Sequence, residues 1–328
     1  MDIDRRKTTA ALALALTGAG WTRTAGAQEA WPARPITFMV PQAAGGSTDT
    51  LAREIGLRLG EALGQSVVVD NKPGANGIIG CDIVAKSKPD GYMLLIGGTG
   101  TMAINQHMYA KMPFDPATAF VPVAMFGYST SVLVVHPSVP VKTIGELITL
   151  IKSRPGAINY ASAGIGSSPH LTAEMFRQMA GVSITHVPYK GSTPGVVATM
   201  AGETQMMFTG VASAVAQIKS GKLKALSISG PKRSNALPGV PTASESGLPG
   251  FEADFWIGLF APAGTPPAIV QRLNAEVVKI LNSGPVKEKF ATSGVDGMAI
   301  TPEAFNQIQA KDIERWAKIV KTAGLKGE

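Results

Sequence analysis

Short apolar runs alternate with longer amphipathic stretches along this chain. Runs of strand length occupy residues 36–41, 67–70, 92–96, 158–161, 184–187, 206–208, 225–229 and 255–261, and a further run covers 123–126 and 131–135. Stretches with helical spacing, or opened by proline or glycine, occupy residues 48–63, 74–86, 145–153, 169–180, 194–201, 266–281 and 302–323. Strands that alternate with helices favour parallel sheets covered by helices. The pattern therefore predicts an α/β protein.

The first long helix shows this pattern clearly. Leu51, Ile55, Leu59 and Leu63 recur four residues apart and form one apolar face, and Gly64 ends the helix. We expect that face to pack against a sheet.

Three loops rich in small residues each join a short apolar run to a predicted helix start. They span residues 41–49, 160–170 and 189–195. Such a loop directs the unpaired backbone N–H groups of the first helical turn beyond the end of the strand, where the helix dipole favours negative charge. One loop of this kind is ordinary in α/β proteins. Three in one chain predict a cleft that holds an anion by its backbone.

The N-terminal residues have the form of a secretory signal. A basic cluster at residues 5–7 precedes an apolar stretch at 8–19, which is too short to span a bilayer, and Ala25-Gly26-Ala27 matches the small-x-small cleavage rule. We expect cleavage before Gln28 and a soluble, exported protein. A buried helix or an uncleaved anchor is the alternative interpretation.

Composition and charge narrow the class of partner. The formal net charge is +7 at pH 7, but the lysines and arginines are scattered and no basic run is interleaved with aromatics. Nucleic acid is therefore not an expected partner, and the basic excess mildly favours acidic ligands. Cys81 is the only cysteine, which excludes an intramolecular disulfide. Its apolar neighbours predict a buried, unreactive thiol.

The common catalytic motifs do not occur in the sequence. There is no G-x-S-x-G, H-E-x-x-H, Walker or C-x-x-C motif. The histidines are dispersed without the spacing of metal ligands: His107, His136, His170 and His186. We interpret His136 and His186 as structural. His170 lies in the first turn of a predicted helix, where a supporting role and direct ligand contact are both open. Asp49 has a similar place, where the helix dipole alone favours a carboxylate.

Several motifs, taken in order, give the chain a family resemblance. They are WPARPITFMVPQAAGGSTDTLAR, VVVDNKPGANGIIG, GTGTMAINQHMY, MPFDPATAFVPVA, INYASAGIGSSPHLTAEMF, VPYKGS, PGVPTASESGLPGF and WIGLFAPAGTP. Over nearly its whole length after the signal, the chain resembles the substrate-binding proteins of tripartite tricarboxylate transporters, the Bug family of bacterial periplasmic receptors. The resemblance implies a two-lobed periplasmic binding protein fold of type II, each lobe a mostly parallel sheet flanked by helices, with the ligand cleft between the lobes. It implies capture of a small organic carboxylate and delivery to integral membrane permease subunits, with no catalysis, cofactor or metal.

The resemblance also implies ligand contacts, position by position. In the first lobe they are Gln42, Ala44, Gly45, Gly46, Ser47 and Asp49, with Thr99 and Thr101 opposite; in the second they are Ser162, Gly164, Gly166, Ser167, Ser168, His170, Tyr189 and Thr209. The chain departs from the family pattern at Gln42, where an aromatic residue is usual, at Gln106, where proline is common, and at Thr209, where an acidic residue is frequent. These departures leave the identity of the carboxylate open.

The order of elements suggests how the lobes are divided. A first crossing is expected near residues 126–131, where Gly127 breaks a strand-rich run, and a second near 229–231, where a stretch rich in Pro, Gly and Ser begins. The first lobe then comprises residues 28–127 and 230–328, and the second lobe 128–229, in a monomeric protein.

Two other functions stay open. A periplasmic sensor that presents its ligand to a histidine kinase would have the same sequence features, and only its partner would distinguish it from a transport receptor. A hydrolase on the same fold is the other alternative, and the lack of a nucleophile–base pair argues against it.

Overall fold

The computed structural model describes residues 31–324, and the strands in that part of the chain form one hydrogen-bonded network. The strands are β1 (Ile36–Val40), β2 (Val67–Asn71), β3 (Met93–Gly98), β4 (Phe120–Val135), β5 (Asn159–Ser162), β6 (Thr185–Pro188), β7 (Met206–Gly210), β8 (Lys224–Ile228), β9 (Asp254–Pro262) and β10 (Val295–Gly297). Their order is β2-β1-β3-β9-β4-β7-β5-β6, and β8 and β10 each pair with β4. The pairs β1–β2, β1–β3, β5–β6 and β5–β7 are parallel, as expected, whereas β4 and β9 have antiparallel neighbours. The sheets are therefore mixed.

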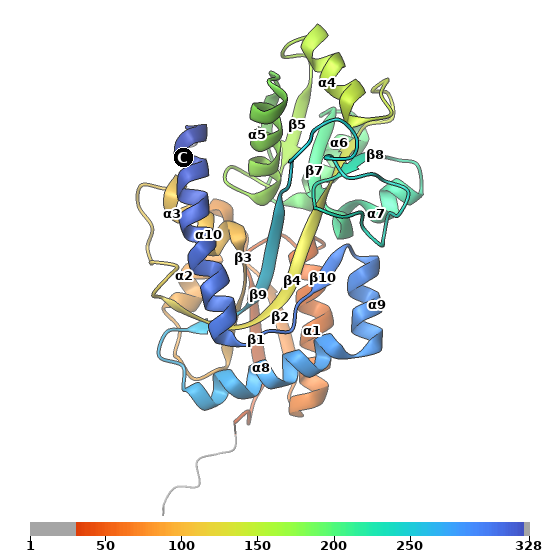
Figure 1. Ribbon diagram of the computed structural model, residues 1–328. Coiled ribbons are helices and arrows are strands. Elements are labelled where there is room, and N and C mark those ends of the chain that lie inside the picture. Colours follow the sequence, from red (N-terminus) through yellow and green to blue (C-terminus); the bar gives the residue numbers. More distant parts are fainter. Residues whose placement is uncertain (1–30, 325–328) are drawn as a thin grey trace, which may run out of the picture.

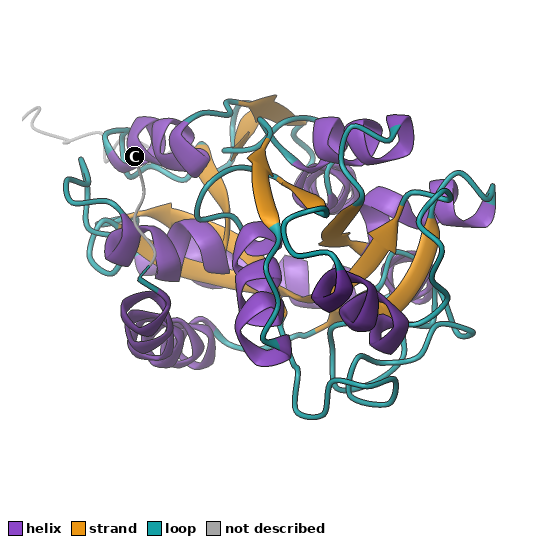
Figure 2. Ribbon diagram, turned by 90° about the horizontal axis from the view of Figure 1, so that it is seen from above, coloured by secondary structure: helices purple, strands orange, loops and turns teal. Residues whose placement is uncertain are grey.

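Helices lie around the strands (Figures 1 and 2). They are α1 (Ser47–Leu63), α2 (Ile78–Ala85), α3 (Asn105–Met108), α4 (Ile144–Ser153), α5 (Ser168–Ala180), α6 (Ser192–Ala201), α7 (Val211–Lys219), α8 (Pro267–Asn282), α9 (Gly284–Thr292) and α10 (Pro302–Ala323), with short turns η1 (Ala75–Gly77) and η2 (Gly100–Ile104) before α2 and α3. The sequence predicted the longer elements close to these bounds. It missed α3, α7, α9 and β10, and it placed a loop at residues 97–101, where β3 ends and η2 begins.

Strand β4 connects the two halves of the network. Its first part pairs with β9 as far as Thr130 opposite Asp254, and its last part pairs with β7 from Ser131 opposite Gly210 onward. Figure 1 shows β4 and β9 running together from the group around β1–β3 toward the group around β5–β8. These two strands therefore link the elements that hold the first loop to those that hold the second and third.

Gly127 does not break β4, contrary to the prediction from the sequence. The strand continues through Gly127, with a shift of its register against β9 between Met125 and Gly127. Gly127 has a φ of 151°, and a Cβ at this position would collide with the backbone of Asp296 in β10. The glycine therefore permits the close approach of β10 instead of ending the strand.

Apolar packing holds the helices on the strands, as the spacing predicted. Leu51, Ile55 and Leu59 of α1 are at most 2% exposed and belong to one buried cluster with Phe38 of β1. Full burial of a large aliphatic or aromatic side chain contributes about 1.5–3 kcal/mol. Cys81 is buried as expected, and burial raises the pKa of its thiol.

No helix within residues 31–324 is both long enough and apolar enough to cross a membrane. The signal sequence predicted at residues 1–27 lies outside the described residues.

Candidate ligand-binding cleft

A cavity of about 470 Å³ lies where loops from both halves of the strand network meet. One side is lined by the β1–α1 loop, the turn before α2 and the end of β3, and the other by the β5–α5 and β6–α6 loops. Ser129 and Ser131 of β4 and Trp256 of β9 also line the cavity. A volume of several hundred Å³ is typical of sites for small molecules.

In the described part of the chain, five helices have an N-cap residue in the lining of this cavity, since Gly77 before α2 and Gly210 before α7 also line it, and three of the five follow the loops identified in the sequence. Helix α1 starts after Gly46, α5 after Ser167 and α6 after Gly191, and each of these N-cap residues lines the cavity. None of the three makes a side-chain capping hydrogen bond. The N–H groups of the first turns therefore keep their capacity to bind an anion. The three loops identified in the sequence do converge on one cavity.

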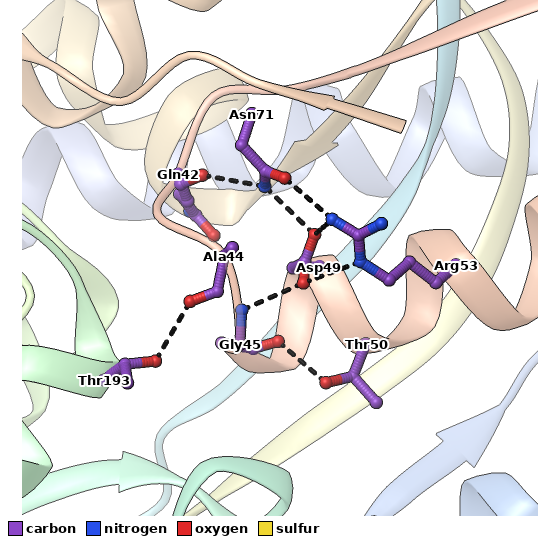
Figure 3. Close-up of polar contacts among 9 residues, drawn as sticks. Gln42, Ala44, Gly45, Asp49, Thr50, Arg53, Asn71 and Thr193 are labelled. Carbon is purple, nitrogen blue, oxygen red and sulfur yellow. Dashed lines mark hydrogen bonds and ion pairs between the residues drawn. The ribbon is translucent and has the colours of Figure 1, made fainter. Parts of the chain in front are cut away.

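Asp49 lies behind the cavity wall and organises the first loop (Figure 3). Its carboxylate accepts hydrogen bonds from the Gly45 amide at 2.9 Å and from the Asn71 side chain at 3.0 Å, and it pairs with the Arg53 guanidinium at 3.0 Å. Burial alone would raise the pKa of Asp49, but the bonds from Arg53, Gly45 and Asn71 outweigh burial and lower that pKa. The charged carboxylate thus stabilises the turn at Gly45, where a φ of 81° favours glycine.

Ser162 and His170 hold the second loop from behind. The Ser162 hydroxyl is fully buried and accepts a hydrogen bond from the Gly164 amide at 3.0 Å. The Nδ1 atom of His170 accepts one from the Gly166 amide, also at 3.0 Å. Gly164 and Ser167 line the cavity, whereas Ser162, His170 and Gly166 do not.

The third loop brings a cation to the cavity. Lys190 lines it beside Tyr189 and Ser192, and this lysine has no ion pair with any residue in the described part of the chain. The ligand contacts implied by the family resemblance do not include this lysine, although it lies inside the VPYKGS motif. A lysine can serve an anion as a compact point charge.

Two threonine hydroxyls on the opposite side are engaged by the protein itself. Thr99 Oγ1 accepts a hydrogen bond from the Trp256 amide at 2.9 Å. Thr101 Oγ1 lies 3.1 Å from both the amide nitrogen and the carbonyl oxygen of Gly98. Both threonines line the cavity. The Thr99 bond joins the residue after β3 to β9, and the Thr101 contacts brace the end of β3 itself.

The structure divides the residues implied by the family resemblance into two groups. Those that line the cavity are Gln42, Gly46, Ser47, Thr99, Thr101, Gly164, Ser167, Ser168 and Tyr189. Those that lie outside the lining are Ala44, Gly45, Asp49, Ser162, Gly166, His170 and Thr209. Lining residues that the sequence did not suggest include Asn76, Tyr109, Ser129, Ser131, Lys190, Ser192 and Trp256. Except for Lys190 and Ser192, these lining residues lie outside the three loops. Strand register and packing decide whether their side chains face the cavity, and neither shows in the local sequence.

Hydrogen bonds join the two walls of the cleft beside α6 and α7. Thr193 Oγ1 donates to the carbonyl oxygen of Ala44 at 3.2 Å, and the hydroxyls of Ser47 and Ser213 lie 3.3 Å apart. The walls are therefore in direct contact at this edge of the cavity. Within residues 31–324, no group of three or more His, Cys, Asp or Glu side chains is placed to hold a metal ion.

Comparisons with known proteins point to one family. The family model described as tripartite tricarboxylate transporter family receptor matches residues 51–325. Protein BugT of Bordetella pertussis (strain Tohama I) is 38% identical over 299 residues, which cover 91% of this chain and 92% of BugT. The solved structure of R. palustris Rpa4515 with adipate has a TM-score of 0.88 and 38% identity, covering 90% of this chain and 99% of that one. The structure of MatC (Rpa3494) from Rhodopseudomonas palustris with bound malate has a TM-score of 0.83 and 34% identity, and the match covers 88% of this chain and 100% of that one.

Proposed function

Because this chain belongs to the tripartite tricarboxylate transporter family of receptors, we propose that its cleft captures a small organic dicarboxylate for the permease subunits of such a transporter. The chain is a periplasmic solute-binding receptor with an α/β periplasmic binding protein fold. Receptors of this family are not enzymes, which removes the hydrolase alternative. The dicarboxylate class is suggested by the adipate and malate that related structures contain.

The convergence of three helix N-termini on one cavity carries this proposal. Each terminus contributes roughly 0.3–2 kcal/mol to holding an anion, depending on burial, whereas micromolar affinity needs about 8 kcal/mol. Hydroxyl groups, Lys190, bridging water and closure of the cleft supply the remainder. An acid with two carboxylates offers four oxygens and two charges to these termini, whereas a monocarboxylate offers two oxygens and one charge.

Direct ligand contacts are assigned to residues at the three termini that line the cavity: Gly46, Ser47, Ser167, Ser168 and Ser192. The predicted residues outside the lining act on binding through the loops that they support. Asp49 does so through Gly45, and His170 through Gly166.

The receptor is proposed to consist of two lobes that close on the ligand. The first lobe comprises residues 28–127 and 230–328 and the second residues 128–229, with a signal peptide removed before Gln28. In support, β4 exchanges β9 for β7 as its partner between Thr130 and Ser131, and the Ser229 amide bonds to the Ser131 carbonyl oxygen at 2.8 Å where the chain returns.

Calorimetry on the protein purified from the periplasm tests the ligand class. Adipate and malate are compared with hexanoate, which keeps the chain length of adipate but has one carboxylate, and with adipamide, which has none. We expect a dicarboxylate to bind at least about tenfold more tightly than hexanoate, a difference of about 1.4 kcal/mol. Equal affinity for hexanoate and adipate, or no binding by any dicarboxylate in a wider panel, contradicts the proposal.

A further inference from the structure

Two imidazole rings stack directly behind the second loop. His170 belongs to the first turn of α5 and His186 to β6, and their ring centroids lie 4.2 Å apart with an interplanar angle of 18°. Tyr160 of β5 also stacks on His186, with ring centroids 4.8 Å apart, and its ring lies 6.4 Å from that of His170. His170 is only 6% exposed and Tyr160 is fully buried. His186 is partly exposed, so His170 is the member of the pair that is closed off from bulk water.

The contact with Gly166 defines the protonation state of His170. A backbone N–H can only donate, so the Nδ1 atom that accepts from the Gly166 amide at 3.0 Å carries no proton. His170 is consequently neutral in this structure, with its proton on Nε2. A second proton would occupy Nδ1 and place two donors against each other.

His186 reaches the same loop through Ser162. Its Nε2 atom lies 2.6 Å from the Ser162 hydroxyl, which in turn accepts the Gly164 amide at 3.0 Å. The two imidazoles therefore hold the loop at Gly164 and at Gly166. The second of these glycines also abuts the opposite wall, since a Cβ on Gly166 would lie 3.0 Å from the Asn76 side-chain nitrogen.

The charged and titratable groups around the pair come from α5 and β5. Glu174 accepts a hydrogen bond from the Tyr160 hydroxyl at 2.7 Å and one from Arg177 at 2.8 Å. Burial lowers the pKa of His170, with Glu174 acting in the opposite direction. Burial and the neighbouring His170 lower the pKa of His186 to about 4, again opposed by Glu174. Both rings are therefore neutral at pH 7.

We propose that His170 and His186 are positioning residues: their neutral forms hold the loop between Ser162 and Ser167 in its ligand-binding shape, and protonation of His170 in acid releases the Gly166 amide and weakens ligand binding. The added proton comes from solvent and moves to Nδ1 of His170. Protonated His170 would be a cation stacked on the His186 ring, with its Nδ1–H facing the Gly166 N–H, which is also a donor. This arrangement is unfavourable. Ligand affinity then depends on the fraction of receptor in which His170 is neutral.

The first test needs no ligand and so is independent of the proposed function. Nitrogen-15 NMR of the imidazoles is expected to show His170 as the Nε2–H tautomer, with a pKa below the ordinary 6.5. The amide signals of Gly164 and Gly166 are expected to shift together at that same pKa. A proton on Nδ1 at neutral pH, or glycine amides that do not follow the His170 titration, overturns the proposal.

The second test rests on the proposed function and uses adipate, with malate as a second probe. The Kd is measured from pH 7.5 down to one pH unit below the His170 pKa that NMR gives, for the parent, for His170→Asn and for His136→Asn. Asparagine can present an acceptor near the Nδ1 position without titrating, so His170→Asn should lack the pH dependence that His170 adds to the titration of the acid and of the other groups of the protein. The control alters a histidine bonded to Ser138, remote from the pair.

We expect the parent and His136→Asn to lose up to about tenfold more affinity per pH unit below the His170 pKa than His170→Asn does. Parallel pH profiles for all three proteins would overturn the proposal, provided that circular dichroism shows them folded; His170→Gln replaces His170→Asn if the latter does not fold. If neither acid binds the parent at pH 7.5, the proposed ligand class fails, and the NMR result still decides the role of the histidines.

Discussion

The hydroxyl of Thr193 donates a hydrogen bond to the carbonyl oxygen of Ala44 at 3.2 Å, so the first turn of α6 touches the loop before α1 across the cleft (Figure 3). A bond of this kind favours a closed cleft by about 1 kcal/mol. In a hinged receptor, the free energy of such bonds adds to the free energy that the bound ligand contributes to closing the cleft.

We therefore expect ligand to reduce the radius of gyration, and Thr193→Val to shift the unliganded protein toward the open form. Small-angle scattering with and without saturating adipate measures both effects. Thr149→Val is the control, because that hydroxyl bonds to the Gly145 carbonyl oxygen within its own helix. Identical scattering curves with and without ligand, in a protein whose unliganded form is not already closed, would argue against a hinge.

Gly46→Val should abolish ligand binding and leave the protein folded. Gly46 has φ −79° and ψ 171°, which valine adopts readily, and a Cβ there would have Ala43 O as its nearest neighbour at 3.7 Å. We expect the free energy of unfolding to change by less than about 1 kcal/mol, while the side chain blocks the N-terminus of α1. Gly45→Val is the matched contrast, since its φ of 81° and a Cβ at 3.2 Å from Thr193 Oγ1 predict a loss of about 1–2 kcal/mol.

Calorimetry and thermal melts on both variants separate loss of the site from loss of the fold. Normal binding by Gly46→Val would place the anion elsewhere.

Ser168→Ala should weaken binding without destabilising the protein. The N-cap of α5 is Ser167, whose hydroxyl donates to the Gly164 carbonyl oxygen at 2.6 Å, and Ser168 is the first helical residue. Ser168 therefore does not cap the helix. Loss of one ligand hydrogen bond costs about 1 kcal/mol, or roughly a fivefold increase in Kd. Ser167→Ala should instead lower the melting temperature, and the reverse ranking in thermal melts would contradict this assignment.

Lys190→Met should weaken carboxylate binding by roughly five- to tenfold, the effect of one charge-assisted contact at an exposed cavity edge. Because Lys190 has no ion pair within the described part of the chain, its removal should leave the melting temperature unchanged. Binding by the parent should also weaken with added salt more steeply than binding by the variant. Lys152→Met, on the exposed side of α4, serves as the control. Equal salt dependence in the parent and in Lys190→Met would exclude a direct role for this lysine.

Asp254→Asn should stabilise the protein at pH 7.5 but not at pH 4. Burial raises the pKa of Asp254 from 3.8 to about 6, with the hydrogen bond from Thr130 opposing this and the charges of Asp296 and Glu252 adding to it. The folded state thus favours the protonated acid, and this contribution to stability is lost as pH rises from about 3.8 to about 6. Asparagine at this position carries no charge, so we expect the free energy of unfolding to rise by on the order of 2–3 kcal/mol at neutral pH. Thermal melts of the parent and the variant between pH 4 and pH 7.5 measure this difference. A stabilisation by Asp254→Asn that is as large at pH 4 as at pH 7.5 would contradict a raised pKa of Asp254.

Local patterns in the sequence were enough to predict many elements and the three helix starts. The four-residue spacing of Leu51, Ile55 and Leu59 describes one helical face, and it is the face that packs on β1. A helix start depends on glycines, serines and prolines within a few residues, so the loops were recognisable without knowledge of the rest of the chain. Element α7 was missed because only Gly210, which is itself the last residue of β7, separates that strand from the run of small residues in the helix.

The tertiary structure alone decided which loop residues face the cavity and which support it from behind. His170 and His186 belong to different elements, α5 and β6, and they stack because β6 pairs with β5, the strand that leads into the loop before α5. Asp49 and Ser162 looked like ligand residues by position, but their hydrogen-bonding capacity is taken up by Gly45, Arg53 and Gly164. Backbone preferences act over a few residues and therefore show in the sequence. The direction of a side chain across a cleft depends on strand register and on packing between distant segments, which no local pattern records.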